Sequence, residues 1–290
     1  MLTGASGFIG SRLFVFFKKS NFSLVPLTNT ASIRGTFAYD LVSDEIPSNL
    51  FNNLSTLIHL AGMAHNSGKT KSKLYKDINY EATMKLAKKA EKAGVKHFVF
   101  VSSSKANTPF DSSNNSSCDT YSSSKRMAEI ELTDYFNLSE MQVSIIRPSL
   151  VYGPNVKGNM KSMLKAIDSG WFPSLPKLEN MKSMIHVDDL ARAIALVASE
   201  NNVHGRVFGL SDGKVYSTDK IYHTLRRVLQ AKEPSWQISK RLLLFLSSLN
   251  FYPGKVIRKI LEDDLIDNSE ITKLGFMPKF SLENLNEEIF

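Results

Sequence analysis

The hydrophobic positions in the first half of the chain predict alternating strands and helices. Two apolar runs, 54–60 and 97–101, are short and end at small or polar residues, as buried parallel strands do. Between them, residues 80–93 show helical spacing, and Gly94 is a typical helix stop. The repeated strand–helix pattern predicts an α/β fold, a Rossmann-type doubly wound parallel sheet. The same pattern predicts strands at 22–27, 143–146 and 207–210 and helices at 121–136 and 188–199.

From about Pro148 onwards, prolines and glycines interrupt the pattern of alternating strands and helices. We therefore expect a dinucleotide-binding Rossmann domain over residues 1–154. The remainder, 155–290, is expected to be mainly a smaller substrate-binding part, with some segments returning to the Rossmann core. The polar stretch 111–117 is expected to be a mobile loop.

A glycine-rich run, Gly4, Gly7 and Gly10 spaced G-x-x-G-x-x-G, lies at the start of the chain and precedes an apolar stretch at 13–17. This spacing suits a tight turn out of a strand, a close approach to a pyrophosphate and a packed helix start that binds phosphate. A glycine loop alone also serves as a plain turn. A strand of about five residues should precede it, whereas only Met1, Leu2 and Thr3 are there. We expect either a shortened first strand or a start site placed downstream of the true one.

Composition narrows the class of protein. The chain has 290 residues, 42% of them hydrophobic, which is enough for a large core. The longest apolar run, 242–249, is too short for a membrane span and is broken by serines. The single cysteine, Cys118, excludes a disulfide framework and favours the reducing cytoplasm as the location. The net charge of +8 is spread out, without an arginine-rich tract, which favours an anionic small substrate over nucleic acid. The histidines are scattered, so no metal site is predicted.

A second chemical signal is Tyr121-Ser-Ser-Ser-Lys125, in which the phenol and the amine lie one turn apart on the same face of a helix. A nearby ammonium favours phenolate, which makes tyrosine usable for proton transfer. Upstream, a predicted strand ends in Ser102, Ser103 and Ser104. The carboxyl ends of parallel strands are where such sheets bind ligands.

With these motifs in place, the sequence resembles the extended short-chain dehydrogenase/reductase family, in particular its nucleotide-sugar epimerases and reductases. The resemblance covers nearly the whole chain, and its late part looks like a subgroup that is UDP-glucose 4-epimerase-like, some of whose members reduce UDP-4-keto-6-deoxy sugars in polysaccharide synthesis. The matching stretches are 4–10, 59–62, 77–80, 98–103, 121–125, 147–154, 185–190 and 208–213.

The resemblance implies catalytic roles. Tyr121 would exchange the proton at the sugar 4-oxygen, Lys125 would lower the pKa of Tyr121, and Ser103 would orient the substrate oxygen, with Ser104 in reserve. The cofactor-binding residues implied are Gly4, Ser6, Gly7, Phe8, Ile9, Gly10, Asn29, Asp40, Leu41, Leu60, Ala61, Gly62, Asn79, Tyr121, Lys125 and Pro148. The substrate-binding residues implied are His65, Ser103, Ser104, Lys157, Asn159 and Lys182.

Departures from the family pattern carry information. Dehydratases of the family have an Asp-Glu pair where this chain has Ser104-Lys105, which argues against dehydration. Many epimerases bind the substrate diphosphate with an arginine where this chain has Lys182, which keeps the charge but loses the bidentate fork. An asparagine often found after Arg147 is Leu150 here.

The choice between NAD and NADP stays open. An acid at the end of the second strand would bind the ribose of NAD, and an arginine there would suit NADP. The chain offers Thr28-Asn29, followed by Ser32 and Arg34, so neither cofactor is excluded.

Three functions remain at this stage. The first is reduction of a UDP-4-keto-6-deoxy-hexosamine, which the resemblance and the permissive strand end favour. The second is 4-epimerisation of a UDP-hexose with the same Tyr-Lys-Ser residues. The third is a non-catalytic dinucleotide-binding scaffold, which would retain those residues by chance. Analogy with the family also predicts a homodimer through helices at 79–93 and 121–136.

Overall fold

The computed structural model describes residues 1–20, 22–29, 35–64, 71–107, 120–249 and 252–286. The chain divides into two compact units. The first unit comprises Met1–Pro148, Leu190–Leu210 and Asn268–Phe276, and the second comprises Ser149–Asp189, Ser211–Asp267 and Met277–Phe290.

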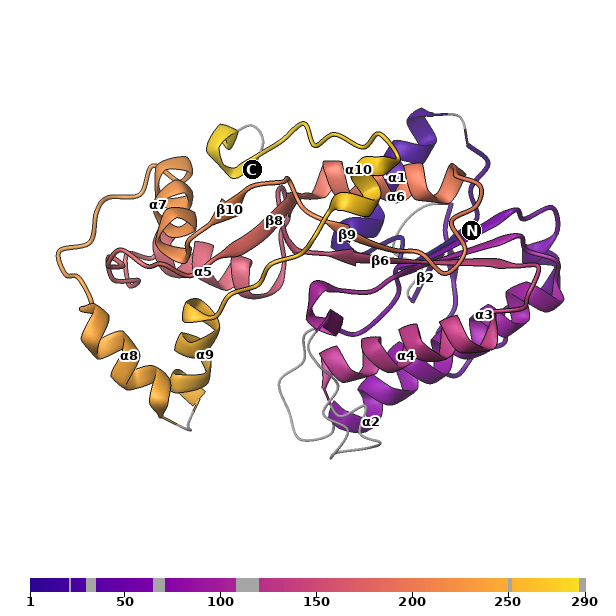
Figure 1. Ribbon diagram of the computed structural model, residues 1–290, viewed down its shortest axis with the longest axis horizontal. Coiled ribbons are helices and arrows are strands. Elements are labelled where there is room, and N and C mark those ends of the chain that lie inside the picture. Colours follow the sequence, from indigo (N-terminus) through magenta and orange to yellow (C-terminus); the bar gives the residue numbers. More distant parts are fainter. Residues whose placement is uncertain (21, 30–34, 65–70, 108–119, 250–251, 287–290) are drawn as a thin grey trace. The chain divides into compact units, whose positions relative to one another are not determined.

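The first unit is built on a seven-stranded parallel sheet with the order β3-β2-β1-β4-β5-β6-β9 (Figure 1). The order 3-2-1-4-5-6 is that of a doubly wound dinucleotide-binding sheet, so the predicted fold class is confirmed. The strands are β1 (Leu2–Thr3), β2 (Pro26–Thr28), β3 (Phe37–Ala38), β4 (Thr56–His59), β5 (His97–Val101), β6 (Gln142–Pro148) and β9 (Val207–Leu210).

Helices cover this sheet and bury its central strands. All five residues of β5 are buried, which explains its continuous apolar run. Ala87 of α3 and Leu132 of α4 pack in one cluster with Phe98 and Phe100 of β5. The helices of this unit are α1 (Phe8–Lys19), α2 (Lys71–Tyr75), α3 (Ala82–Lys92), α4 (Tyr121–Tyr135), α10 (Ser269–Lys273) and most of α6 (Val187–Ser199). Short 3-10 turns occur at η1 (Ser48–Phe51) and η3 (Ser104–Asn107).

Several predicted elements differ in detail from those observed. The strand expected at 22–27 occupies Pro26–Thr28. The helix expected at 80–93 is longer and includes a π-helical segment, η2 (Lys76–Glu81), between α2 and α3. The first strand is shortened to Leu2–Thr3, yet it pairs with β2 on one side and β4 on the other. The segment 207–210 returns to the sheet beside β6, as expected. The stretch 111–117 and Cys118 lie outside the described residues.

The second unit contains a smaller sheet with the order β10-β8-β7. Its polar core includes Tyr216, which donates a 2.7 Å hydrogen bond to Asp212, and Asp189, whose carboxylate accepts from the backbone of Lys279 and Phe280. Within the described ranges, no helix of the chain is long and apolar enough to cross a bilayer. The elements are β7 (Leu150–Tyr152), β8 (Lys182–His186), β10 (Val215–Tyr216), α5 (Gly158–Asp168), α7 (Thr218–Val228), α8 (Lys240–Ser248), α9 (Tyr252–Leu261) and η5 (Leu282–Asn284).

Candidate active site

The glycine loop leaves β1 and enters α1 without room for side chains. Gly4 has φ +71°, and a Cβ there would lie 2.8 Å from the backbone nitrogen of Ala61. A Cβ on Gly10 would lie 2.1 Å from the carbonyl oxygen of Gly4. Gly7 is the N-cap of α1, which has no side-chain cap and no acidic residue in its first turn. The loop therefore fits a dinucleotide, because a bare, positively polarised helix start suits a pyrophosphate.

Gly62, in the loop after β4, is a second position where the structure leaves no room for a side chain; we call it the Gly62 cradle. A Cβ at this position would lie 2.9 Å from Oδ1 of Asn79 and 3.3 Å from Nζ of Lys125. A side chain here would press on the amine that the sequence assigns to catalysis. Glycine thus keeps the space beside Lys125 open, as a bound nicotinamide ribose would require.

The local sequence fixes where α4, the helix that carries Tyr121 and Lys125, begins. Thr120 and Ser123 form a reciprocal capping box, in which the Thr120 hydroxyl accepts from Ser123 N–H and the Ser123 hydroxyl accepts from Thr120 N–H. Tyr121 is therefore the first residue of α4. One turn on, the Lys125 ammonium is buried, donates a 2.9 Å hydrogen bond to the carbonyl of Val101 and lies 4.5 Å from the ring centre of Phe100.

The structure brings Tyr121, Lys125 and Ser103 together. The Ser103 hydroxyl lies close enough to the Tyr121 phenol to lower its pKa. Ser103 follows β5, and its hydroxyl also accepts from Lys105 N–H at 3.2 Å. Ser104, the reserve candidate, is buried in η3.

Asn79 holds the surrounding backbone in place from the π-helical segment η2. Its side-chain oxygen accepts from Met63 N–H at 2.8 Å, and its amide group donates to the Met63 carbonyl and to the Ser124 hydroxyl, each at 3.0 Å. A π-bulge inserts a residue into the helix and often marks a functional position. Asn79 thereby joins the loop after β4 to the first turn of α4.

The pKa of Tyr121 differs from the sequence-based expectation. Burial raises the pKa of the Tyr121 phenol above its usual value, and the Ser103 hydroxyl opposes this without overcoming it. Burial also lowers the pKa of Lys125 to about 8, while the charge of Glu129 acts in the opposite direction. Desolvation therefore acts against the low tyrosine pKa that the sequence predicts. The role of Lys125 toward Tyr121 stays a prediction.

Sequence reasoning missed a buried ion pair beneath this site. Glu129 is 2% exposed and accepts two bonds from Arg147, at 2.6 and 3.0 Å, and one from Arg126 at 3.2 Å. Arg147 also donates to Asn107 in η3 at 3.0 Å. The signal was present, because Glu129 follows Lys125 by four residues and so lies on the same helix face.

A hydrogen-bonded chain links the glycine loop to Asn79. The Thr3 hydroxyl accepts from Ala61 N–H and bonds Nδ1 of His59 at 2.7 Å. Nε2 of His59 bonds the Thr83 hydroxyl at 2.9 Å, and Thr83 donates to the carbonyl of Asn79. His59 is fully buried, and burial, followed by the charge of Lys125, lowers its pKa to about 3. His59 therefore has a structural role in this hydrogen-bonded chain.

This buried neutral histidine predicts acid sensitivity. Between pH 6.5 and 3 the unfolded chain binds a proton at His59 that the folded chain does not, so the free energy of unfolding falls as pH falls through this window. His97, whose pKa burial lowers to about 4, acts in the same direction. Urea unfolding at several pH values should show this decline. His59→Gln should flatten it, whereas His223→Gln, on an exposed residue of α7, should not; equal slopes in both variants would contradict the assignment.

The remaining cofactor candidates lie at strand ends and in the loops that follow the strands, or outside the described residues. Asn29 is exposed directly after β2, and Pro148 is buried at the end of β6. The Asp40 carboxylate accepts from Val42 N–H at 2.9 Å and so shapes its own turn. Ser32, Arg34 and His65 lie outside the described residues. Ser6, Phe8 and Ile9 occupy the glycine loop and the start of α1, and Leu60 and Ala61 follow β4.

The substrate candidates Lys157, Asn159 and Lys182 belong to the second unit. Lys157 is the N-cap of α5, and both it and Asn159 are exposed. The Lys182 ammonium donates to the carbonyls of Lys259 and Glu262, at 3.1 and 2.7 Å, at the C-terminal end of α9. Two of its three donors thus serve the helix end, where a cation is favourable.

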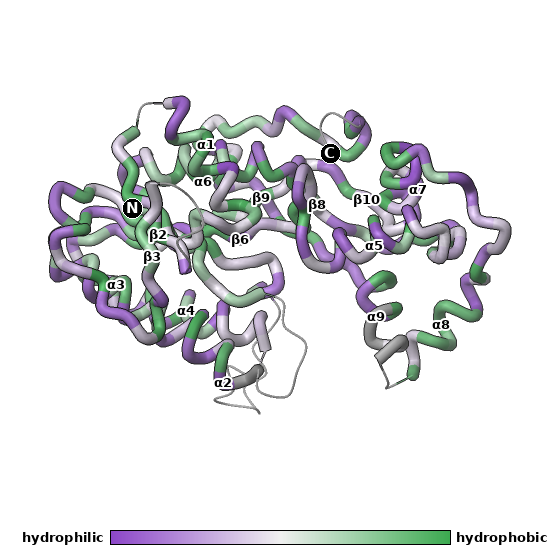
Figure 2. The backbone as a smooth tube through the Cα atoms, turned by 180° about the vertical axis from the view of Figure 1, so that it is seen from behind, coloured by the Kyte–Doolittle hydropathy of each residue, from purple (hydrophilic) through white to green (hydrophobic). Residues whose placement is uncertain are grey.

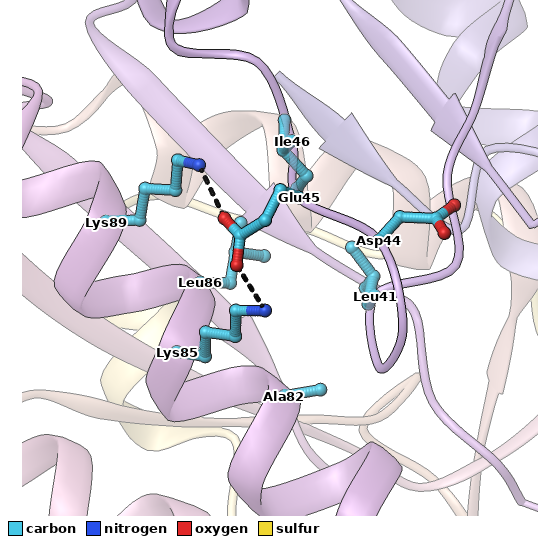
Figure 3. Close-up of a pocket in the computed structure, with 8 residues that line it drawn as sticks. All are labelled: Leu41, Asp44, Glu45, Ile46, Ala82, Lys85, Leu86 and Lys89. Carbon is cyan, nitrogen blue, oxygen red and sulfur yellow. Dashed lines mark hydrogen bonds and ion pairs between the residues drawn. The ribbon is translucent and has the colours of Figure 1, made fainter.

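A small hollow beside α3 lies apart from these groups. It is lined by Leu41, Ile46, Ala82 and Leu86, and Glu45 points between Lys85 and Lys89, 2.7 and 3.1 Å away (Figure 3). The exposed ion pairs and apolar walls describe packing of the 40–46 loop on the helix. In the part of the chain that is described, no cluster of histidine, cysteine or acidic side chains could hold a metal ion.

The chain is similar in sequence and in fold to known proteins. The sequence model of the NAD dependent epimerase/dehydratase family matches residues 1–210. A UDP-glucose 4-epimerase of Vibrio cholerae is 31% identical over 255 residues, covering 82% of this chain and 77% of its own. The N-acetyl-α-D-glucosaminyl-diphospho-ditrans,octacis-undecaprenol 4-epimerase of Escherichia coli O157:H7 is 25% identical over 315 residues, covering 97% and 91%. The solved structure of MoeE5 with UDP-glucose and NAD superposes with a TM-score of 0.75 at 23% identity, covering 97% of this chain and 93% of that one.

Proposed function

The chain belongs to the NAD-dependent epimerase/dehydratase family, and on that premise we propose that it is a 4-epimerase of a sugar carried on a diphosphate, with a UDP-hexose as substrate. The observation that carries the proposal is the Tyr121 phenol beside Ser103, with Lys125 one turn away on α4. These groups lie at the carboxyl end of β5, where parallel sheets bind ligands. The relatives from V. cholerae and E. coli are both named as 4-epimerases, which supports the net reaction.

The residues of the first unit would divide the chemistry among themselves. NAD, held at Gly4, Gly7, Gly10 and the Gly62 cradle, supplies hydride transfer at C4 when bound. Tyr121 Oη takes the proton of the sugar 4-hydroxyl and later returns one to the 4-oxygen. The Ser103 hydroxyl orients that oxygen.

Two further groups would hold this machinery in position. The Lys125 ammonium, with its pKa near 8, offsets charge that develops on the phenol. Asn79 fixes the backbone that borders both groups, through Met63 and Ser124. The buried hydrogen bonds from Thr3 through His59 and Thr83 would fix the position of the glycine loop relative to Asn79.

A second candidate is 4-ketoreduction, and the raised pKa of Tyr121 favours it. A phenol that stays protonated at neutral pH is ready to donate to a keto oxygen, whereas epimerisation also needs the phenolate in its first half-reaction. The residues are the same, and the two reactions differ in whether the cofactor is consumed.

One assay separates the two candidates. A 4-epimerase should convert UDP-glucose to UDP-galactose, or UDP-N-acetylglucosamine to its 4-epimer, without added cofactor once purified with bound NAD. A 4-ketoreductase should oxidise one equivalent of NADH or NADPH for each UDP-4-keto-sugar reduced. C4 inversion without net cofactor oxidation supports the epimerase, and stoichiometric oxidation without inversion refutes it.

The carrier of the sugar is a related question. UDP-sugars and polyprenyl-diphosphate sugars present the same diphosphate beside the sugar ring, and the E. coli relative is named for the polyprenyl form. The assay should therefore include both carriers at equal concentration. We further propose NAD as the cofactor and retain the homodimer as a prediction.

A further inference from the structure

The second unit exposes an apolar helix face on α8. Leu244 and Phe245 are 52% and 62% exposed, and Leu242 is also exposed. Arg241, Leu244, Phe245 and Ser248 follow the spacing i, i+3, i+4, i+7 and share one face. Leu243, on the opposite side, is buried in the unit. Figure 2 shows that α8 is mostly hydrophobic along its length. Leu243 packs inside the unit, whereas Leu244 and Phe245 meet solvent.

Both tryptophans of the chain are exposed near the start of this helix. Trp171 is 77% exposed and Trp236 is 52% exposed. Trp236 precedes Ser239, the N-cap of α8, by three residues. The segment after Trp171 is held to it, since Ser174 N–H donates to the carbonyl of Trp236 at 3.1 Å. An exposed indole, apolar with one polar N–H, is typical of a membrane–water interface.

The charges within the segment 234–261 are all basic, although Glu179 pairs with Lys240 at 3.5 Å and Glu262, Asp263 and Asp264 follow the segment. Between Pro234 and Leu261 the sequence has Lys240, Arg241, Lys255, Arg258 and Lys259 and no acidic residue, so this stretch supplies +5 of the net +8. Gly254 lets α9 approach α8 closely, because a Cβ there would lie 2.1 Å from the carbonyl oxygen of Leu249. Arg258 donates to the carbonyl of Ser247 at 3.0 Å. Arg258 thus joins α9 to the apolar helix α8.

We propose that the α8 face, comprising Arg241, Leu244, Phe245 and the neighbouring Trp236, docks on the surface of an anionic lipid bilayer. The helix is too short to span a bilayer, and a helix with exposed apolar residues beside basic ones lies in the headgroup region. A second copy of the chain is a poor occupant, because pairing this face with itself would oppose basic residues. The proposal does not depend on the reaction catalysed.

Vesicle flotation tests the proposal with the full-length protein. The wild type should float with vesicles of phosphatidylglycerol and phosphatidylethanolamine and stay at the bottom with phosphatidylcholine alone. Leu244→Ser/Phe245→Ser should lower the partition at least tenfold, since each apolar side chain loses its burial. Arg241→Gln should lower it about fivefold, the equivalent of ~1 kcal/mol for each basic residue at an anionic surface. Leu138→Ser, at a 96% exposed leucine of the first unit, is the matched control.

Each outcome decides the proposal. Flotation that is lost in the double variant, kept in Leu138→Ser and accompanied by a blue shift of the wild-type tryptophan emission supports it. Circular dichroism should show that the double variant remains folded. Absence of flotation, or equal flotation of the double variant and the control, overturns it. If the wild type instead forms larger species that the double variant does not, the face is a contact between copies and the proposal is wrong.

Discussion

Replacing Tyr121 by phenylalanine should lower kcat by about three orders of magnitude, within the range of 10²–10⁴ that a positioned acid–base group contributes. The substitution removes only the phenolic oxygen, which lies beside Ser103. The capping box of Thr120 and Ser123 does not involve the phenol, so α4 should still begin at the same residue. NAD binding, measured by calorimetry, should change little, which would locate the loss in the chemical step.

Tyr75→Phe provides the matched control for this experiment. The Tyr75 ring centre lies 6.4 Å from that of Tyr121, in the same unit and at the end of α2. Tyr75 is the smallest of the three causes that shift the pKa of Tyr121, after burial and Ser103, so this variant should keep near-wild-type kcat. Full activity of Tyr121→Phe would refute the catalytic assignment of Tyr121, whichever reaction the enzyme performs.

Much of the fold followed from local patterns. The run at 97–101 is strongly apolar, and the structure has β5 over the same residues. A strand that is buried on both faces is apolar at every position, so its two ends are visible in the sequence. The helix at 121–136 was equally clear, since Thr120 and Ser123 cap it locally. The strand at 22–27 was misplaced because an apolar run does not fix register. Pairing with β1 at Leu2 and Thr3 selects Pro26–Thr28 instead.

The site was harder to predict than the fold. Tyr121 and Lys125 stood out because their spacing has a chemical meaning in isolation. The direction of the Tyr121 pKa did not follow, since it depends on how completely the fold removes the phenol from water. The π-helical segment η2, which aims Asn79 at Met63 and Ser124, has no local sequence signature.

Among the variants proposed here, Arg147→Met should lower the free energy of unfolding most, by about 3 kcal/mol or more. The reason is that removing one partner of a buried ion pair leaves the other charge uncompensated. Glu129 is almost fully buried, and Arg147 supplies two of its three bonds from arginine. Methionine preserves much of the apolar stem of arginine, so the loss should reflect charge rather than a cavity. Because Arg147 also contacts Asn107 in η3, which begins just after Ser103, kcat should fall as well.

Urea unfolding should be compared with Arg206→Met and with the double variant Glu129→Gln/Arg147→Met. Arg206 pairs with Glu270 at 2.8 Å in the same unit, but both side chains are partly exposed, so its loss should cost about 1 kcal/mol or less. The double variant should recover part of the stability lost in Arg147→Met, since no charge then remains buried alone. Equal losses for Arg147→Met and Arg206→Met would show that the Glu129 pair is no stronger than a surface pair. In that case the position of α4 must be set by its capping box and by its packing on η2, α3 and the sheet.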